Sequence, residues 1–240
     1  MIYVYVANVK SLSAKCEADM MEYNRLVNSL CEERRAKVNA LKQPADRIRS
    51  LAAGLLLQCS LQEYLFYSVG QKDCGHRHET KMHMVSEIDE EVIRNAERMK
   101  KLNIEYGQHE KPYLPDYPGI FFNLSHSGDY VTVAVSCHPV GIDVQEKRTI
   151  SDALKDKFFT EKERTAKTPG YYIFSGKESY VKLTGEGMSR SFQDFSVDFA
   201  KKQVFCVNTG EVLAYLRYKE IEDGAYIVCV CDKCRDIISW

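Results

Sequence analysis

The spacing of apolar residues predicts helices in the first half of the chain. Residues 1–6 are apolar and aromatic, as in a strand, and a long helical pattern follows over residues 14–42. Pro44 interrupts that pattern, and a second, mostly apolar helix is expected to begin at Asp46. The first helical pattern carries an apolar stripe at three- and four-residue spacing, formed by Met20, Tyr23, Leu26, Val27 and Leu30.

The pattern changes in the middle of the chain, and strands predominate after it. Residues 69–102 are polar and charged without a clear period, so we expect an elaboration there with a short helix near residues 90–99. Three short strands are then predicted at residues 121–124, 130–136 and 140–144, and two helices at residues 151–158 and 171–183. Gly185 and Gly187 end the second of these helices. Four alternating segments predict a closing antiparallel set, at residues 195–199, 203–207, 212–218 and 225–231.

Each half of the chain thus runs from strand to helices to further strand material. This order predicts an α+β protein built from two similar lobes. We expect an N-terminal lobe over residues 1–112, which includes the elaboration near residues 69–102, and a C-terminal lobe over residues 113–240.

The composition is that of an ordinary globular protein. The chain has 240 residues, of which 45% are hydrophobic and 28% are charged, and its formal net charge is −1. That charge argues against a general nucleic-acid binder, whose domain would be clearly basic. No apolar run is long enough to span a membrane, and the first residues lack the basic start of a signal peptide. We therefore expect a cytoplasmic protein.

Nine cysteines are scattered along the chain without the spacing of a disulfide framework. In a reducing compartment most of them would be buried as small apolar residues. Two groups could instead bind zinc: Cys74, His76, His78 and His83 in one case, and Cys229, Cys231 and Cys234 in the other. A polar loop also explains the first group, and strand alternation explains the start of the second. A zinc-dependent interaction protein remains an alternative.

The strongest chemical signal comes from two short segments. In one, strand alternation places Asp143 and Gln145 on the same face. In the other, helical spacing places Glu178 and Lys182 on the same face. If strand and helix meet, two carboxylates and an amide oxygen converge beside an ammonium group. That set suits Mg²⁺ held through oxygens, with the lysine neutralising phosphate, and it indicates an enzyme of the phosphoryl-transfer type.

The sequence around these segments resembles the Sfp-type 4'-phosphopantetheinyl transferases. Order and spacing match together over residues 112–197, through Phe-Asn-Leu-Ser-His-Ser-Gly-Asp at 122–129, Pro-Val-Gly-Ile-Asp at 139–143, Lys-Glu-Ser-Tyr-Val-Lys at 177–182 and Gly-Glu-Gly-Met at 185–188. The resemblance implies transfer of 4'-phosphopantetheine from coenzyme A to a serine of an acyl or peptidyl carrier protein, which releases adenosine 3',5'-bisphosphate. It also implies a pseudo-dimer of two α+β lobes, with coenzyme A and Mg²⁺ in the cleft between them. We expect a monomer.

The resemblance also assigns roles to individual residues. The metal ligands would be Asp143, Gln145 and Glu178, and the catalytic residues would be Asp143, Glu178 and Lys182. Glu178 is in addition a candidate to take the proton of the incoming serine. The groups expected to bind coenzyme A are Arg34, Lys37, Arg49, Ser50, Lys111, Ser125, His126 and Lys182.

Two positions depart from the family's pattern. The family more often carries Glu where this chain has Gln145, and a glycine is expected before Lys111, where His109 and Glu110 stand. An amide oxygen can still ligate Mg²⁺, directly or through water, but it adds no charge. A catalytically silent relative that binds coenzyme A or a carrier is therefore kept as an alternative. The carrier could serve fatty-acid, polyketide or nonribosomal-peptide synthesis. Candidates for the surface that meets it are Phe158, Phe159, Tyr171 and Tyr172, for which a place in the core is the alternative.

Overall fold

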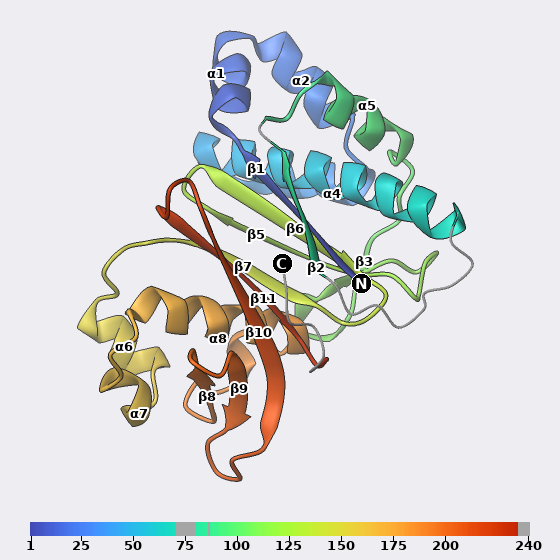
Figure 1. The fold of residues 1–240 in the computed structure, drawn as a ribbon. Coiled ribbons are helices and arrows are strands. Elements are labelled where there is room, and N and C mark those ends of the chain that lie inside the picture. Colours follow the sequence, from blue (N-terminus) through green and yellow to red (C-terminus); the bar gives the residue numbers. More distant parts are fainter. Residues whose placement is uncertain (71–79, 86, 235–240) are drawn as a thin grey trace.

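The protein's computed structural model describes residues 1–70, 80–85 and 87–234 (Figure 1). Its N-terminal part contains strand β1 (Ile2–Asn8) and helices α1 (Lys10–Ala18), α2 (Met20–Asn28), α3 (Glu32–Ala40) and α4 (Pro44–Gly70). The next elements are β2 (Thr80–Val85), α5 (Glu90–Arg98), β3 (Glu105–Tyr106), the 3-10 turn η1 (Gln108–Glu110) and β4 (Pro112–Tyr113). No helix within the described ranges is both long and apolar enough to cross a bilayer.

The C-terminal part follows the predicted order of strands and helices. It contains β5 (Phe121–Ser127), β6 (Tyr130–Ser136), β7 (Gly141–Glu146), α6 (Asp152–Phe158), α7 (Glu161–Arg164) and α8 (Gly170–Thr184). The 3-10 turn η2 (Gly187–Ser189) leads to β8 (Phe195–Asp198), β9 (Gln203–Cys206), β10 (Val212–Ile221) and β11 (Tyr226–Asp232). The predicted elements of this part are confirmed to within three residues at their ends, and α7 is an addition to them.

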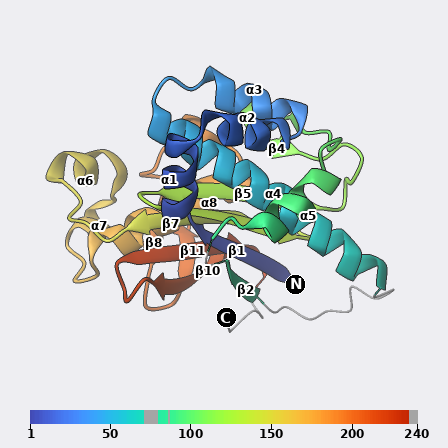
Figure 2. The same ribbon diagram turned by 90° about the horizontal axis from the view of Figure 1, so that it is seen from above.

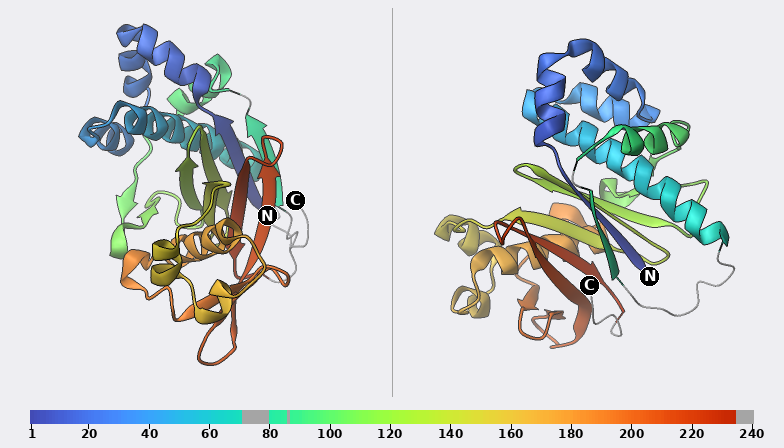
Figure 3. Two further views of the ribbon diagram at one scale, coloured as in Figure 1. Left: turned by 90° about the vertical axis from the view of Figure 1, so that its left-hand side faces the viewer. Right: turned by 45° about the horizontal axis from the view of Figure 1, so that its top comes forward.

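Two larger sheets form the centre of the molecule. The first has the strand order β2-β1-β6-β5, with β1 parallel to β2 and antiparallel to β6. The second has the order β7-β11-β10-β9-β8 and is antiparallel throughout. Helix α4 lies on the first sheet, and α1, α3 and α5 pack on α4 (Figure 1, Figure 2). These N-terminal helices are at the opposite end of the molecule from helices α6–α8 (Figure 3).

Alternate residues of the strands belong to different cores. On β1, Tyr5 and Ala7 pack beneath the N-terminal helices, whereas Val4 and Val6 pack against the second sheet. The second sheet in turn packs its other face against α8. The two sheets are therefore layered between two groups of helices, and the edge strands β5 and β7 lie in contact with each other.

The predicted helix over residues 14–42 is wrong as a single element, because three helices occupy this region. Asp19 starts the second of them: its carboxylate accepts hydrogen bonds from the backbone N–H groups of Met21 (2.8 Å) and Glu22 (3.2 Å). The region expected as a polar elaboration contains the predicted short helix, α5, which buries its apolar face against α4. It also contributes β2, a strand that the sequence pattern did not predict.

Sheet membership divides the chain later than the predicted boundary at residues 112/113. Strands β5 and β6 join the N-terminal strand β1 in one sheet, so residues 121–136 belong to the first sheet. Local patterns show where strands lie, but they do not show which distant strand each one pairs with. The change of sheet falls between Ser136 and Gly141, while the α+β class itself is confirmed.

Candidate active site

Strand β7 presents two polar side chains toward helix α8. Ile142 and Val144 pack into the core between the two sheets, so Asp143 and Gln145, which alternate with them, point to the opposite face. Asp143 is 5% exposed and Gln145 is 7% exposed. The alternation predicted for this strand is confirmed, including the core position of Val144.

Helix α8 approaches β7 closely because residue 141 is glycine. A Cβ atom on Gly141 would lie 1.9 Å from the carbonyl oxygen of Ser179 and 2.6 Å from the backbone nitrogen of Leu183. The close approach brings Glu178 and Lys182, one helical turn apart, to the side of Asp143. A glycine inside an apolar strand is a signal of close backbone approach, so Gly141 indicates this contact in addition to its place in the Pro-Val-Gly-Ile-Asp motif.

Asp143 is the centre of a hydrogen-bonded group that joins three elements. Its Oδ1 accepts hydrogen bonds from Ser125 Oγ of β5 and Lys182 Nζ of α8, each at 2.8 Å. Lys182 Nζ also donates to Ser125 Oγ at 2.8 Å. The second carboxylate oxygen of Asp143, Oδ2, is buried and has no hydrogen-bond partner in the part of the chain that the structure describes. A buried anionic oxygen without a donor is unfavourable, so this atom marks a place for a cation or a donor group.

Glu178 adds a second carboxylate to this group. Burial raises the pKa of Glu178, the charge of Asp143 raises it further, and Lys182 opposes both effects. One lysine therefore offsets only part of the negative charge that two poorly solvated carboxylates would carry.

These donors fit a hard cation. Within the described ranges, no three His, Cys, Asp or Glu side chains form a metal-binding group. A cation here would depend on Asp143 Oδ2, the carboxylate of Glu178 and the amide oxygen of Gln145. All three are oxygen donors of the kind that Mg²⁺ prefers, and Mg²⁺ commonly completes its shell with water and substrate phosphate.

Positive groups gather around His126, at the end of β5. His126 is exposed to solvent, yet the surrounding protein desolvates its ring and lowers its pKa, and the charges of Arg49, Lys182 and Lys37 lower that pKa further. Asp46, which binds Arg49, acts in the opposite direction. The cations come from α3, α4 and α8, so both halves of the chain contribute to one electropositive, solvent-accessible region. Such a region suits a ligand with several phosphate groups.

Comparison with known proteins identifies the family. The model of the 4'-phosphopantetheinyl transferase superfamily matches residues 139–231, which include β7, α8 and the closing strands. The chain is 30% identical to the 4'-phosphopantetheinyl transferase Sfp of Bacillus subtilis (strain 168) over 153 residues, which cover 58% of this chain and 68% of that relative. The chain belongs to this superfamily. It is a transferase, and its predicted membership of the Sfp type is confirmed.

Further relatives agree with this assignment. The 4'-phosphopantetheinyl transferase ffp of Bacillus subtilis is 29% identical, with the same coverage of 58% of this chain and 68% of the relative. The 4'-phosphopantetheinyl transferase psf-1 of Bacillus pumilus is 37% identical over 107 residues, which cover 41% of this chain and 46% of that protein.

Two residues predicted to bind coenzyme A in this transferase are turned into the protein. Arg34 of α3 is 6% exposed, and its guanidinium donates hydrogen bonds to the backbone carbonyl (3.0 Å) and the hydroxyl (3.4 Å) of Ser50 on α4. Ser50 is also buried. The pair joins α3 to α4, and its contact with coenzyme A stays a prediction. Lys37 and Arg49, in contrast, lie near the solvent-accessible His126, and their charges lower its pKa.

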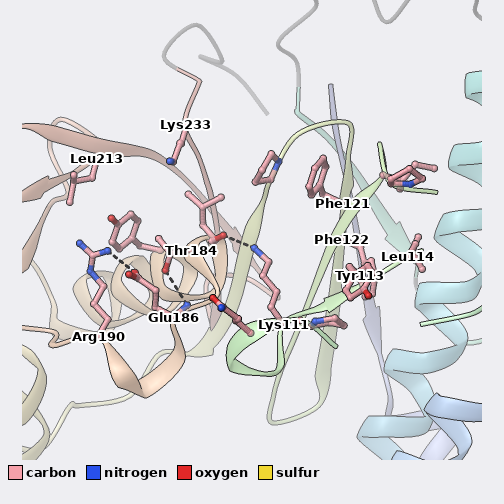
Figure 4. Close-up of a pocket in the computed structure, with 18 residues that line it drawn as sticks. Lys111, Tyr113, Leu114, Phe121, Phe122, Thr184, Glu186, Arg190, Leu213 and Lys233 are labelled. Atoms are coloured by element: carbon pink, nitrogen blue, oxygen red, sulfur yellow. Dashed lines mark hydrogen bonds and ion pairs between the residues drawn. The ribbon is translucent and has the colours of Figure 1, made fainter. Parts of the chain in front are cut away.

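Lys111 lies near the C-terminal end of α8. Its Nζ donates a hydrogen bond to the carbonyl oxygen of Leu183, and burial lowers the pKa of Lys111. Lys111 also lines a pocket of about 820 Å³, together with Phe122 and Tyr180 and the charged side chain of Arg190 (Figure 4). Most residues around this pocket come from β4, β5, the end of α8 and the segments beside them, and Asp143, Ser125 and Lys182 are not among its lining residues.

The residue before Lys111 has a backbone conformation that glycine adopts without strain. Glu110 has a φ of 60°, and His109 has a φ of 55°. The left-handed region is unfavourable for residues with a Cβ atom. The transferase thus keeps a left-handed backbone at the position where the family's pattern places glycine.

The described residues of the zinc alternative take part in packing. His83 on β2 stacks on the rings of Tyr5 (centroids 4.9 Å apart) and Tyr3 (5.9 Å). Cys229 and Cys231 are buried in β11 beneath α8, while Cys234 follows that strand. The remaining candidates, Cys74, His76 and His78, lie outside the described residues.

The aromatic candidates for the carrier surface divide into two pairs. Phe158 and Phe159 are buried in the core of the second sheet and its helices, so this pair belongs to the core and not to a carrier surface. Tyr171 and Tyr172 are partly exposed, and Lys147 lies over both rings.

Proposed function

We propose that this transferase moves the 4'-phosphopantetheine group from coenzyme A to a serine of an apo acyl or peptidyl carrier protein in an Mg²⁺-dependent reaction. The names of its relatives support the transfer in general. The observation that carries the finer proposal is the buried Oδ2 of Asp143, which has no hydrogen-bond partner among the described residues and lies beside a second carboxylate and near the cations around His126. The enzyme would act as a cytoplasmic monomer.

Asp143, Glu178 and Gln145 would hold the metal ion. Bound there, Mg²⁺ would supply positive charge to the pyrophosphate of coenzyme A and so favour displacement at phosphorus. Gln145 supplies a neutral oxygen, so Asp143 and Glu178 provide the negative charge of the protein ligands.

The chain's own groups account for positioning and charge. In the reaction, the serine oxygen of the carrier forms a bond to the phosphorus that bears pantetheine. The bond from that phosphorus to the bridging oxygen breaks, and adenosine 3',5'-bisphosphate leaves with the bonding electrons. Lys182 donates hydrogen bonds to both Ser125 and Asp143, and its ammonium there can stabilise negative charge on the leaving oxygen.

Glu178 is the candidate acceptor of the serine proton. Burial and Asp143 raise its pKa, whereas Lys182 and a metal ion bound by the same carboxylate would lower it, so Glu178 would act by positioning the serine hydroxyl as much as by removing its proton. His126, Arg49 and Lys37 would bind the phosphates at the adenosine end of coenzyme A.

The decisive experiment is a transfer assay analysed by mass spectrometry. The protein is incubated with coenzyme A, Mg²⁺ and apo carrier proteins from fatty-acid, polyketide and nonribosomal-peptide systems. We expect the mass of a phosphopantetheine adduct on at least one carrier, and its loss when EDTA removes the metal. Coenzyme A binding without an adduct on any carrier would instead favour the catalytically silent relative.

A further inference from the structure

The boundary between the two sheets is bridged by a row of side chains on β5. β5 is an edge strand of the first sheet and β7 is an edge strand of the second. Asn123, Ser125 and Ser127 occupy alternate positions of β5, so their side chains point to one face. Each of the three makes a hydrogen bond to β7.

The outer two bonds take the place of a backbone ladder. The backbone N–H of Ile142 donates to Oδ1 of Asn123 at 3.4 Å, and the backbone N–H of Glu146 donates to Oγ of Ser127 at 3.2 Å. An edge strand carries N–H groups that need a partner. The Ile142 N–H is buried and would be costly without one, whereas the bond of the Glu146 N–H lies at the exposed end of the strand. Side-chain oxygens of β5 thus satisfy two N–H groups at the edge of β7 and hold the two strands one side chain apart.

The middle bond belongs to the active site. Ser125 Oγ donates to Oδ1 of Asp143 at 2.8 Å, between the bonds of Asn123 and Ser127. Any shift of β7 along or away from β5 would therefore move Asp143 relative to His126, the neighbour of Ser125 on the other face of the strand.

We propose that Asn123 and Ser127 are positioning residues that fix the distance between the metal-binding carboxylates and the phosphate-binding cations. The inference rests on the proposed function, in which one coenzyme A molecule contacts both groups at once. Neither Asn123 nor Ser127 needs to touch substrate. They act on catalysis through the placement of β7.

Ser127 offers an isosteric test, because valine and threonine have nearly the same shape and only threonine keeps a hydroxyl. Ser127→Val should raise the KM for coenzyme A and the Mg²⁺ concentration for half-maximal rate, each by about three- to tenfold, and leave the KM for the carrier unchanged. Ser127→Thr should stay near the wild type. Asn123→Leu should resemble Ser127→Val. Ser60→Ala serves as the control, since it removes a buried hydroxyl that bonds within α4 (2.9 Å to the carbonyl of Leu57).

Amide hydrogen exchange tests the same bonds without activity. The Glu146 N–H should exchange faster in Ser127→Val than in Ser127→Thr, and the Ile142 N–H should exchange faster in Asn123→Leu. Equal exchange and equal KM for coenzyme A in the valine and threonine variants would overturn the proposal, as would the same KM increase in Ser60→Ala. If the wild type transfers nothing, the proposed function fails, while exchange and the coenzyme A dissociation constant still decide whether the two residues hold β7.

Discussion

Lys182 on α8 forms an ion pair with Asp143 on β7, with 2.8 Å between Nζ and Oδ1. The aspartate side chain is 7% exposed and the lysine side chain is 27% exposed, so the lysine is the more accessible partner and the carboxylate is buried. The pair uses one carboxylate oxygen and leaves Oδ2 buried without a partner among the described residues. This division of the two oxygens is what makes Asp143 the main candidate for metal binding.

Asp143→Asn tests that role with little change in shape. The amide can keep the bonds from Ser125 and Lys182 to Oδ1, but it removes the charge and replaces Oδ2 with an NH₂ group. We expect the transfer rate to fall by about 10²-fold or more, with an unchanged circular dichroism spectrum. Asp232→Asn is the matched control, because Asp232 is a buried partner of Arg217 in β10 and should affect stability rather than rate. Normal turnover in Asp143→Asn would exclude Asp143 as a metal ligand.

Gln145 and Val144 are neighbours on β7 with opposite environments. Gln145→Glu adds a negative charge on the face of Asp143, so it should lower the Mg²⁺ concentration needed for half-maximal activity. Val144 is 1% exposed between the two sheets, and Val144→Glu should lower the free energy of unfolding by about 3 kcal/mol or more, because it buries an unpaired charge. A Mg²⁺ titration and urea unfolding measure the two effects. An unchanged Mg²⁺ requirement in Gln145→Glu would contradict its place at the metal.

The centre of the site could be predicted because its signals are local. Strand alternation fixed the faces of Asp143 and Val144, and helical spacing placed Glu178 and Lys182 together. The family motifs then linked the two segments. The two segments form one site if α8 packs on β7, and Gly141 permits that close packing.

The missed features depend on contacts between distant parts of the chain. Strand β2 gains its extended form by pairing with β1, and it is a short strand inside a segment that is polar and charged without a clear period. The burial of Arg34 depends on Ser50 of another helix. The break at Asp19 is the exception, because an aspartate followed by a glutamate three residues later is a recognisable helix start.

The cations around His126 make its pKa a measure of their proximity. Since desolvation and neighbouring positive charge lower that pKa, Arg49→Ala should raise the pKa of His126 toward its ordinary value. The recovery should be partial, because desolvation is the larger cause and remains in the variant. Arg47→Ala is the control, as Arg47 is on the same helix but donates to the carbonyl of Leu41. An NMR titration of the His126 ring measures this pKa. Equal pKa values in the two variants would show that the charge of Arg49 does not act on His126.

Phosphate binding should reverse the shift. A bound phosphate favours protonated His126, so binding takes up a proton in the range around its pKa. The affinity for coenzyme A should therefore fall as the pH rises through that range, and His126→Gln should remove this dependence. Calorimetric titrations at several pH values would show it, and an identical pH profile in His126→Gln would rule out the contact.

Lys177 points away from the active site, although it is the residue before Glu178. It is 0% exposed, and its Nζ contacts Glu163 at 2.9 Å and donates to the carbonyl oxygens of Phe192 and Phe195, each at 2.7 Å. Lys177→Met leaves the Glu163 carboxylate buried without its cation and should lower the free energy of unfolding by about 3–5 kcal/mol. The double variant Lys177→Met/Glu163→Gln should recover part of that loss.

A surface pair gives the comparison for this buried one. Lys201 lies 3.7 Å from Asp198 with 72% of its side chain exposed, so Lys201→Met should change stability by about 1 kcal/mol or less. Chemical denaturation of the three variants provides the measurement. A loss in Lys177→Met as small as that in Lys201→Met would show that the buried pair is not required to hold α8.

Glu110 and Gly185 both have a left-handed backbone conformation, and both are neighbours of Lys111. Glu110 precedes Lys111 in the chain, and Gly185 packs against the Lys111 side chain. Glu110 has a φ of 60° and Gly185 a φ of 74°, and a Cβ atom on Gly185 would lie 2.6 Å from Cδ of Lys111. Glu110→Gly removes the strain of a Cβ atom in this region, about 1–2 kcal/mol, but makes the unfolded chain more flexible by about 0.5–1 kcal/mol. We expect a net gain in the free energy of unfolding of up to about 1 kcal/mol.

Gly185→Ala should lower the free energy of unfolding, because it adds both backbone strain and a steric clash with Lys111. Urea unfolding curves of the two variants test the pair, and a less stable Glu110→Gly would mean that the glutamate side chain contributes more than its backbone conformation costs.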